Sequence, residues 1–216
     1  QDKEVQRLVF PRQPKHDRIC LADFYRPIND EGIRDVVALQ GVTMGSEVTD
    51  VMDKLEEDGE FAEQLFTHGL GVQSAEGLAE WLHQKVRSDL GIEPTQGRRY
   101  SWGYPACPDQ SEHEKVWELL DLNQIGMYLS GGFAVMPEQS TVAIISHHPD
   151  AVYFGMKSGF IPKDGPAPDE VIVRRLYLDI VQVQDGTPVR VGEEAARLSI
   201  ALAIGAILGT PLLAQE

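Results

Sequence analysis

The sequence predicts an α+β fold in which a mainly antiparallel β-sheet is flanked by helices. Short runs of β-branched residues occur in mixed order with stretches of helical periodicity. Three of these runs, between residues 133 and 156, are joined by segments of a few residues, which favours antiparallel pairing. The 216 residues are 42% hydrophobic and 25% charged, a composition typical of a folded chain with a packed core.

The first part of the chain predicts an arm followed by two strands. Residues 1–17 carry many charges together with Pro11 and Pro14, and they predict a linker or arm. Residues 18–24 have the pattern of a strand, and residues 35–43 are dense in β-branched side chains. We expect these two strands to lie near each other in one sheet.

Helical periodicity dominates the next stretch. Apolar residues recur at helical spacing from Ser46 to Gly59 and again over residues 61–69, which predicts a helix with a potential break at Gly59. Ser74 is the predicted N-cap of a further helix that runs to Gly91. That helix has an apolar face for packing and a polar face for solvent or a ligand.

The middle of the chain predicts a loop, a short helix and three strands. The loop covers residues 92–108, and the helix covers residues 114–122. The strands are expected at residues 133–136, 141–146 and 152–156. Their short connections predict that they pair as antiparallel neighbours.

The last fifty residues predict a linker, a strand and a helix. Three prolines and a glycine make residues 162–169 a linker by composition. Residues 171–183 are typical of one long strand, and residues 192–208 of a helix that covers the sheet.

Charge and cysteine content exclude several classes of partner. The chain has 19 Lys and Arg against 34 Asp and Glu, a formal net charge of −15, so we expect no nucleic acid partner. The longest apolar stretch, residues 198–208, is about half the ~20 residues that a membrane-spanning helix needs, so we expect no membrane. Cys20 and Cys107 lack the spacing of a zinc site and are expected to be packed free thiols. With no apolar leader at its start, the chain is expected to be cytoplasmic.

A ten-residue segment has the composition of a binding loop. Residues 99–108 read Arg-Tyr-Ser-Trp-Gly-Tyr-Pro-Ala-Cys-Pro. The guanidinium of Arg99 can donate two parallel hydrogen bonds to a carboxylate. Gly103 allows the backbone to approach a ligand, and Pro105 stiffens the turn that follows.

This segment resembles the R-x-x-x-G-Y-P-A-C-P signature of the S-adenosylmethionine-binding activation domain of cobalamin-dependent methionine synthase. Other short segments resemble the same family in the same order, over about residues 18–156. They are Leu-Ala-Asp-Phe at 21–24, Ala-Glu-Trp-Leu-His at 79–83, Trp-Glu-Leu-Leu at 117–120 and His-Pro-Asp at 148–150. The resemblance implies an activation-domain-like core at residues 18–160. Residues 1–17 are expected to be a linker or arm, and residues 161–216, which have no counterpart in the family, a C-terminal extension packed on the core.

The resemblance also implies which residues bind S-adenosylmethionine. Arg99 is expected to bind the methionyl carboxylate, the backbone around Ser101 and Gly103 to cradle the ligand, and Tyr104 to lie near the reacting methyl group. No residue is expected to act as a nucleophile, because catalysis by such a domain consists of positioning the methyl group.

Four more residues occupy positions where the family has ligand contacts. Glu76 and Glu93 match acidic residues that are important for binding, although ordinary helix and loop acids explain them equally well. Tyr153 and Phe154 match a pair of aromatic contacts. Position 154 is Phe where a second Tyr can occur, so stacking remains there without a hydroxyl contact.

The function implied is that of the activation domain in methionine biosynthesis, part of a methyltransferase. S-adenosylmethionine is the methyl donor for reductive methylation of inactive cob(II)alamin, with an electron from a flavodoxin-type reductase. The cobalamin signature D-x-H-x-x-G is absent from the sequence, so cobalamin is expected from another domain or chain. A basic patch of Lys85, Arg87, Arg98 and Lys115 is the candidate for docking the acidic reductase.

Two alternatives remain open. The family's Asp-Trp-x-Pro-Phe-Phe segment, whose Asp contacts the ligand, does not occur in the sequence. The chain could therefore be a non-catalytic scaffold or interaction module with an incomplete site. It could also reactivate another corrinoid methyltransferase.

Overall fold

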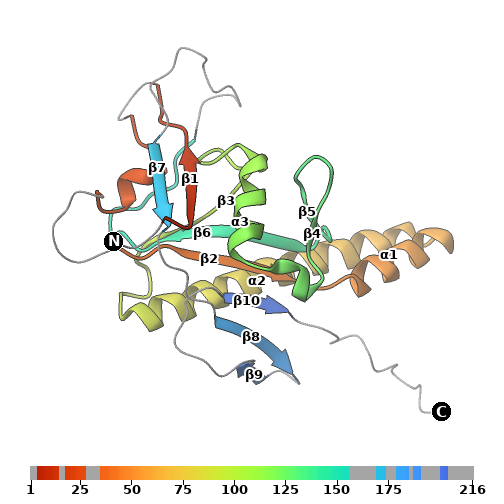
Figure 1. Cartoon of the computed structure of the whole chain (residues 1–216). Helices are drawn as coiled ribbons and strands as arrows, with labels where there is room; N and C mark the ends of the chain where they lie inside the picture. The colour runs from red at the N-terminus through yellow and green to blue at the C-terminus, as the bar shows by residue number, and fades with distance from the viewer. Residues whose placement is uncertain are drawn as a thin grey trace.

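A computed structural model describes residues 4–14, 18–27, 35–155, 169–173, 179–184, 187–190 and 200–203 of the chain. Its centre is a six-stranded sheet with the strand order β3-β6-β2-β10-β8-β9 (Figure 1). The strands are β2 (Ala38–Thr43), β3 (Arg98–Ser101), β6 (Ser140–Ser146), β8 (Asp179–Gln184), β9 (Thr187–Arg190) and β10 (Ile200–Ala203). Strand β3 therefore stands at one end of the sheet.

The sheet is mainly antiparallel, as predicted. Strand β6 pairs antiparallel with both β2 and β3, and β8 pairs antiparallel with β9. Strand β10 is the exception, since it pairs parallel with β2 and with β8. The α+β class predicted from the sequence is confirmed.

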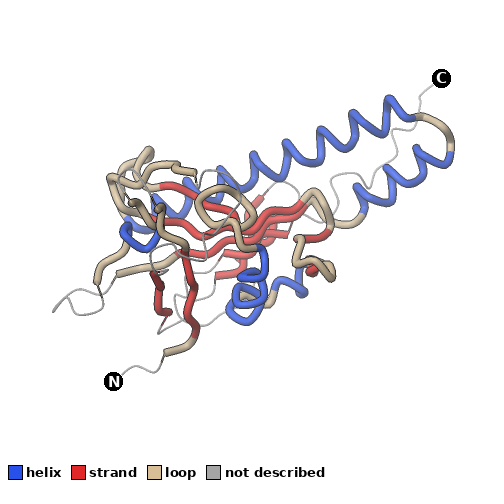
Figure 2. The backbone as a smooth tube through the Cα atoms, turned by 90° about the horizontal axis from the view of Figure 1, so that it is seen from above, coloured by secondary structure: helices blue, strands red, loops and turns tan. Residues whose placement is uncertain are grey.

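Helix α2, the second helix of a hairpin, lies along one face of the sheet (Figure 2). Helix α1 (Glu47–Glu57) and helix α2 (Phe61–Leu90) are joined by a turn in which Gly59 has a positive φ of 76°. The second half of α2 packs on β2 and β6 through a buried apolar cluster. The cluster consists of Ala38, Val42, Ala79, Leu82, Val86 and Ile145.

The larger core lies on the opposite face of the sheet. It includes Leu39, Tyr100 and Ile144 from the sheet. It also includes the 3-10 helix η1 (Leu21–Phe24), helix α3 (His113–Leu119) and the antiparallel pair β1 (Gln6–Phe10) and β7 (Asp169–Val173). Two further 3-10 helices, η2 (Gln110–Glu112) and η3 (Leu122–Ile125), and the small ladder of β4 (Tyr128–Leu129) with β5 (Val135–Met136) complete this side.

Two predictions for the N-terminal part are wrong. The strand expected at residues 18–24 is instead a 3-10 helix over Leu21–Phe24, because the Asp23 carboxylate accepts the backbone N–H of Cys20 at 2.9 Å and caps the turn. Within the predicted arm, Gln6–Phe10 is a strand whose Leu8 and Phe10 side chains are fully buried. Burial of these two side chains makes the segment part of the core.

The prediction for residues 46–91 is correct in helical content and wrong in the helix boundaries. The break at Gly59 is confirmed, but Ser74 lies inside α2 and caps no helix. Gly71 allows α2 to continue, because it lies against α1, where an added Cβ would be 3.0 Å from a Val48 methyl. Close packing against α1 thus compensates for the low helix propensity of glycine.

The strands predicted in the middle of the chain are partly confirmed. Residues 141–146 form β6, whereas β5 pairs with β4 and not with β6. Residues 152–155 form no strand. The predicted loop at 92–108 contains β3, and the predicted helix at 114–122 begins and ends earlier, as α3.

The C-terminal predictions also change. The long strand predicted at 171–183 is divided between β7, which pairs with β1, and β8, which pairs with β10. Residues 200–203, predicted to be helical, form strand β10 of the central sheet. The predicted linker before Asp169 lies outside the described residues. No helix in the described part of the chain is long and apolar enough to span a membrane.

Candidate functional site

Edge strand β3 presents two different faces. Arg99 and Ser101 pair in register with Ile145 and Ala143 of β6, on the side that α2 covers. Tyr100 pairs with Ile144 and belongs to the opposite core. Because side chains alternate along a strand, consecutive residues of the signature lie on opposite sides of the sheet.

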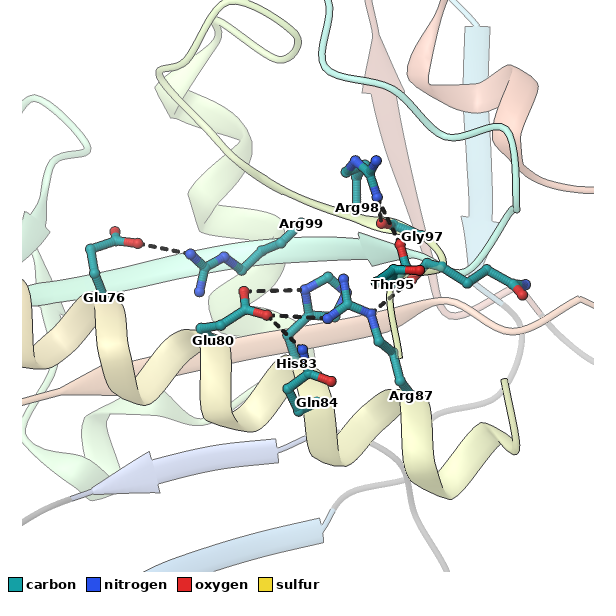
Figure 3. A network of polar contacts seen from close by, with 10 residues as sticks. Glu76, Glu80, His83, Gln84, Arg87, Thr95, Gly97, Arg98 and Arg99 are labelled. Carbon is teal, nitrogen blue, oxygen red and sulfur yellow. Dashed lines mark hydrogen bonds and ion pairs between the residues drawn. The ribbon is translucent and has the colours of Figure 1, made fainter. Parts of the chain in front are cut away.

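Arg99 is the most informative residue on the α2 face (Figure 3). Its Nη2 donates to Oε2 of Glu76 on α2 at 2.8 Å, and its side chain is only 14% exposed. Its Nη1 is buried and has no hydrogen-bond partner among the described residues. An unpaired buried donor on a charged group is costly, and this atom is available to an external acceptor such as a carboxylate.

Three further polar residues of α2 continue this face along the helix. Glu80 accepts a hydrogen bond from Nη1 of Arg87 at 3.2 Å, and its carboxylate lies 3.9 Å from Nδ1 of His83. His83 is 2% exposed, and burial, with the adjacent Arg87 cation, lowers its pKa to about 4. The imidazole is therefore neutral near pH 7, and its Nε2 is a second buried atom without a partner among the described residues.

Arg87 also fixes the loop that leads into β3. Its Nε donates to the Gln96 carbonyl at 2.8 Å, and the Gln96 side chain donates to the His147 carbonyl at the same distance. Gly97 follows with a φ of 76°, where an added Cβ would be 2.2 Å from the Ser146 carbonyl oxygen. This loop therefore tolerates only glycine at position 97 and enters β3 in a fixed direction.

A tight turn follows β3 and supports the aromatic residue of the signature. Gly103, with φ 86°, donates its N–H to the Cys107 carbonyl, and Cys107 donates its N–H to the Tyr104 carbonyl at 3.0 Å. The Cys107 thiol is buried, contacts the Ser101 carbonyl, and has a pKa raised to about 12 by burial, which agrees with the predicted packed thiol. Tyr104 is 65% exposed at the tip of this turn.

The aromatic pair lies on the other side of β3. The ring of Tyr153 is 69% exposed and meets the edge of Tyr100 at a centroid distance of 5.7 Å. Phe154 is half-buried and packs against the core, where its ring contacts both Phe24 and Tyr100. The segment nevertheless approaches the turn, because an added Cβ on Gly155 would lie 3.4 Å from Cβ of Pro105.

The structure brings some of the predicted residues together and separates others. Arg99 and Glu76 are bonded to each other, and Ser101 lies on the same face of the sheet, with its hydroxyl 3.4 Å from that of Thr141. Tyr153 and Phe154 belong to the opposite face. Glu93 is exposed in the loop before β3, and no hydrogen bond joins its side chain to another described residue.

Sequence reasoning gave Arg87 no role in the site, and it placed Glu80 and His83 only on a polar helix face. The signal was present, because positions 76, 80, 83 and 87 follow the i, i+4, i+7 spacing of one helix face. The partner of Arg87 is a backbone carbonyl, which no side-chain pattern reveals.

The predicted basic patch does not form. Arg87 is only 6% exposed and is occupied by its bonds to Glu80 and Gln96. Lys85 pairs with an aspartate on α2, and Lys115 pairs with a glutamate beside α3, on the other face of the sheet. In the described part of the chain, no group of three His, Cys, Asp or Glu residues could hold a metal ion.

Known proteins match a large part of this chain. Residues 2–164 match the family model described as the vitamin B12 dependent methionine synthase activation domain. Among curated relatives, methionine synthases of Mycobacterium tuberculosis and Mycobacterium leprae are 35% and 34% identical to this chain. The match covers 69% of this chain and 14% of each relative, so the chain spans a small part of their length.

A solved structure is also similar. It is described as the MetH reactivation domain bound to AdoHcy and is 31% identical, covering 52% of this chain and 39% of that chain with a TM-score of 0.48. The family match extends over most of the described residues and includes the signature at 99–108. The chain therefore belongs to the family of vitamin B12-dependent methionine synthase activation domains.

Proposed function

We propose that this chain binds S-adenosylmethionine and presents its methyl group for the reductive methylation of inactive cob(II)alamin in methionine synthase. The observation that supports this function is the buried, unpaired Nη1 of Arg99 beside the carboxylate of Glu76. Together they offer one donor and one acceptor on neighbouring groups, which is the complement of an amino-acid head group.

The two charges fit the methionyl end of the ligand. The ligand carboxylate accepts from Nη1 of Arg99, and this satisfies a buried donor that is otherwise unpaired. The ligand ammonium donates to Glu76, whose side chain is 48% exposed and has acceptor capacity beyond its bond to Arg99. Binding thus adds hydrogen bonds without breaking the Arg99–Glu76 pair.

The turn after β3 then supplies the rest of the site. The backbone of Ser101 and Gly103 borders the ligand, and Tyr104 has an exposed ring suited to cation–π contact with the sulfonium. Glu93 is exposed before the strand and remains a candidate for a polar contact at the open side.

The aromatic pair contributes unequally in this proposal. Tyr153 has an exposed ring that can stack on adenine, provided that the ligand passes around the end of β3. Phe154 is half-buried and packs against the core, so its part in this proposal is to support Tyr153 and not to contact the ligand.

The other components of the reaction come from outside the described residues. S-adenosylmethionine supplies the methyl group, a cobalamin-binding domain of methionine synthase supplies the corrinoid, and a flavodoxin-type reductase supplies the electron. This chain holds and orients the methyl donor, and the exposed position of Tyr104 keeps that end of the site open to a partner domain. Localisation in the cytoplasm, where these components meet, belongs to the same proposal.

A calorimetric titration with S-adenosylmethionine and with S-adenosylhomocysteine tests the proposal. Both ligands are expected to bind, and Lys85→Ala, which removes a cation whose partner is on the same helix, is expected to leave the affinity unchanged. If neither ligand binds, the proposal fails and the alternative of a non-catalytic scaffold module remains.

A further inference from the structure

The first half of helix α2 exposes an apolar surface. Figure 2 shows the α1–α2 hairpin extending beyond the end of the sheet. Phe61, Leu65, Phe66 and Leu70 are 64%, 69%, 69% and 67% exposed. A surface helix normally turns such side chains inward, so four of them in about three turns mark a surface that no other described part of the chain covers.

Helix α1 does not cover this face. Positions 64, 67 and 68 of α2 are half-buried and position 71 is buried, and these four follow the i, i+3, i+4, i+7 spacing of one face. Gly71 in that row lies against Val48, so the row is the side in contact with α1. Leu65, Phe66 and Leu70 lie on the side of the helix turned away from it.

Acidic residues are concentrated in the same hairpin, on α1 and in the turn that leads to Phe61. Residues 47–63 contain eight Asp and Glu and a single basic residue, Lys54. All eight acidic side chains are exposed: Glu47, Asp50, Asp53, Glu56, Glu57, Asp58, Glu60 and Glu63. Five of the eight lie within residues 56–63, so the turn at which the apolar segment of α2 begins is strongly acidic.

We propose that this hairpin docks an amphipathic helix whose apolar stripe is flanked by Lys and Arg, supplied by a partner domain or protein. The apolar residues favour a helix, because the Phe66–Leu70 row forms an i, i+4 ridge that fits between the side-chain rows of a second helix. The acidic turn at the start of this segment favours cationic flanks on the partner.

The same acidic residues argue against other occupants. A second copy of the hairpin would bring its own eight acidic residues against these, and like charges at close range disfavour that contact. An acidic flavodoxin-type protein meets the same repulsion. The hairpin surface is also separate from the ligand-binding residues, since Leu70 and Glu76 lie about 9 Å apart along the helix axis at 1.5 Å per residue.

Two synthetic peptides probe this surface directly. One is an amphipathic helix of about 18 residues made of Leu and Lys, and its match has Glu at every Lys position. The Leu/Lys peptide is expected to bind the full chain in a fluorescence anisotropy titration, and the Leu/Glu peptide is not. Phe66→Ser combined with Leu70→Ser is expected to weaken binding about tenfold or more. Tyr128→Ser, which removes a 53% exposed aromatic ring elsewhere, is expected to have no effect.

Three results would overturn the proposal. The first is equal affinity of the double variant and the wild type for the Leu/Lys peptide, which indicates attraction by charge alone. The second is binding of the Leu/Glu peptide. The third is self-association of the wild-type chain in sedimentation experiments that the double variant abolishes. The Arg99→Ala variant is expected to bind the Leu/Lys peptide normally, so failure of S-adenosylmethionine binding and failure of docking are distinguishable. The replaced side chains are exposed, and an unchanged melting temperature checks that each variant is folded.

Discussion

Replacing Arg99 with Ala separates ligand binding from stability more sharply than any other single change. In the folded chain this guanidinium makes one hydrogen bond, to Glu76 at 2.8 Å, and leaves Nη1 buried without a partner among the described residues. The variant removes both atoms. The consequences for the free protein and for the complex differ, because the unpaired atom is proposed to be satisfied only by the ligand.

The stability cost is expected to be small. Glu76 is 48% exposed, and an ion pair of that kind contributes about 0–1 kcal/mol. Removal of an unpaired buried donor offsets part of that loss. We therefore expect Arg99→Ala to lower the free energy of unfolding by at most about 1 kcal/mol in a urea titration.

The loss of affinity is expected to be much larger. A charge-assisted hydrogen bond to the ligand carboxylate is worth about 1.5–3 kcal/mol, which corresponds to a roughly tenfold to hundredfold weaker Kd for S-adenosylmethionine. Calorimetry on wild-type, Arg99→Ala and Lys85→Ala chains measures this difference. An affinity of Arg99→Ala within a factor of about two of the wild type would refute the assignment of the carboxylate to Arg99.

Three further predictions concern the supports of the site. Gly97→Ala should lower the free energy of unfolding, measured in urea, by about 2 kcal/mol or more, because residue 97 has a φ of 76° and an added Cβ would lie 2.2 Å from the Ser146 carbonyl oxygen. The control Gly77→Ala, in helix α2 with open space around its Cβ, should be neutral or stabilising. Burial lowers the pKa of His83 to about 4, so the folded state favours the neutral imidazole. The resulting contribution to the free energy of unfolding is fully present above about pH 6.5 and is lost as the pH falls towards 4. Over that range a His83→Gln variant should lose about 3 kcal/mol less stability than the wild type. Burial raises the pKa of Cys107 to about 12, so iodoacetamide at pH 8 should alkylate it only after unfolding in urea, and rapid labelling of the folded chain would contradict its packed position.

The sheet strands with strong β-branched patterns could be predicted from the sequence. Residues 38–43 and 140–146 form β2 and β6, since Val, Ile and Thr favour a pleated, buried strand. The 3-10 helix over Leu21–Phe24 could not, because Leu-Ala-Asp-Phe reads like a short strand. Its actual form depends on the Asp23 cap and on an ion pair between Asp23 and the distant Arg12.

Helix and strand boundaries that depend on tertiary packing could not be predicted from the sequence either. Gly69, Gly71 and Ser74 look like the end of one helix and the start of another, yet α2 runs through them with Gly71 packed against α1. Strand β3 escaped prediction because its four residues carry two arginines and lie beside turn residues.

For the candidate site, the family resemblance predicted which residues belong to it, and the structure shows which of them contact each other. The pairing of Arg99 with Glu76 joins residues 23 positions apart, which no local pattern could indicate. Arg87 donates to a backbone carbonyl, and a sequence pattern of side chains does not indicate backbone partners. The half-buried position of Phe154 against the core depends on its contacts with Tyr100 and Phe24 on the face opposite Arg99.

The most direct test compares S-adenosylmethionine with decarboxylated S-adenosylmethionine, which lacks only the carboxylate. The wild-type chain is expected to prefer the intact ligand by about tenfold or more, and Arg99→Ala is expected to bind the two ligands with nearly equal affinity. If the preference for the carboxylate persists in Arg99→Ala, or is absent from the wild type, the buried Nη1 of Arg99 does not bind that group.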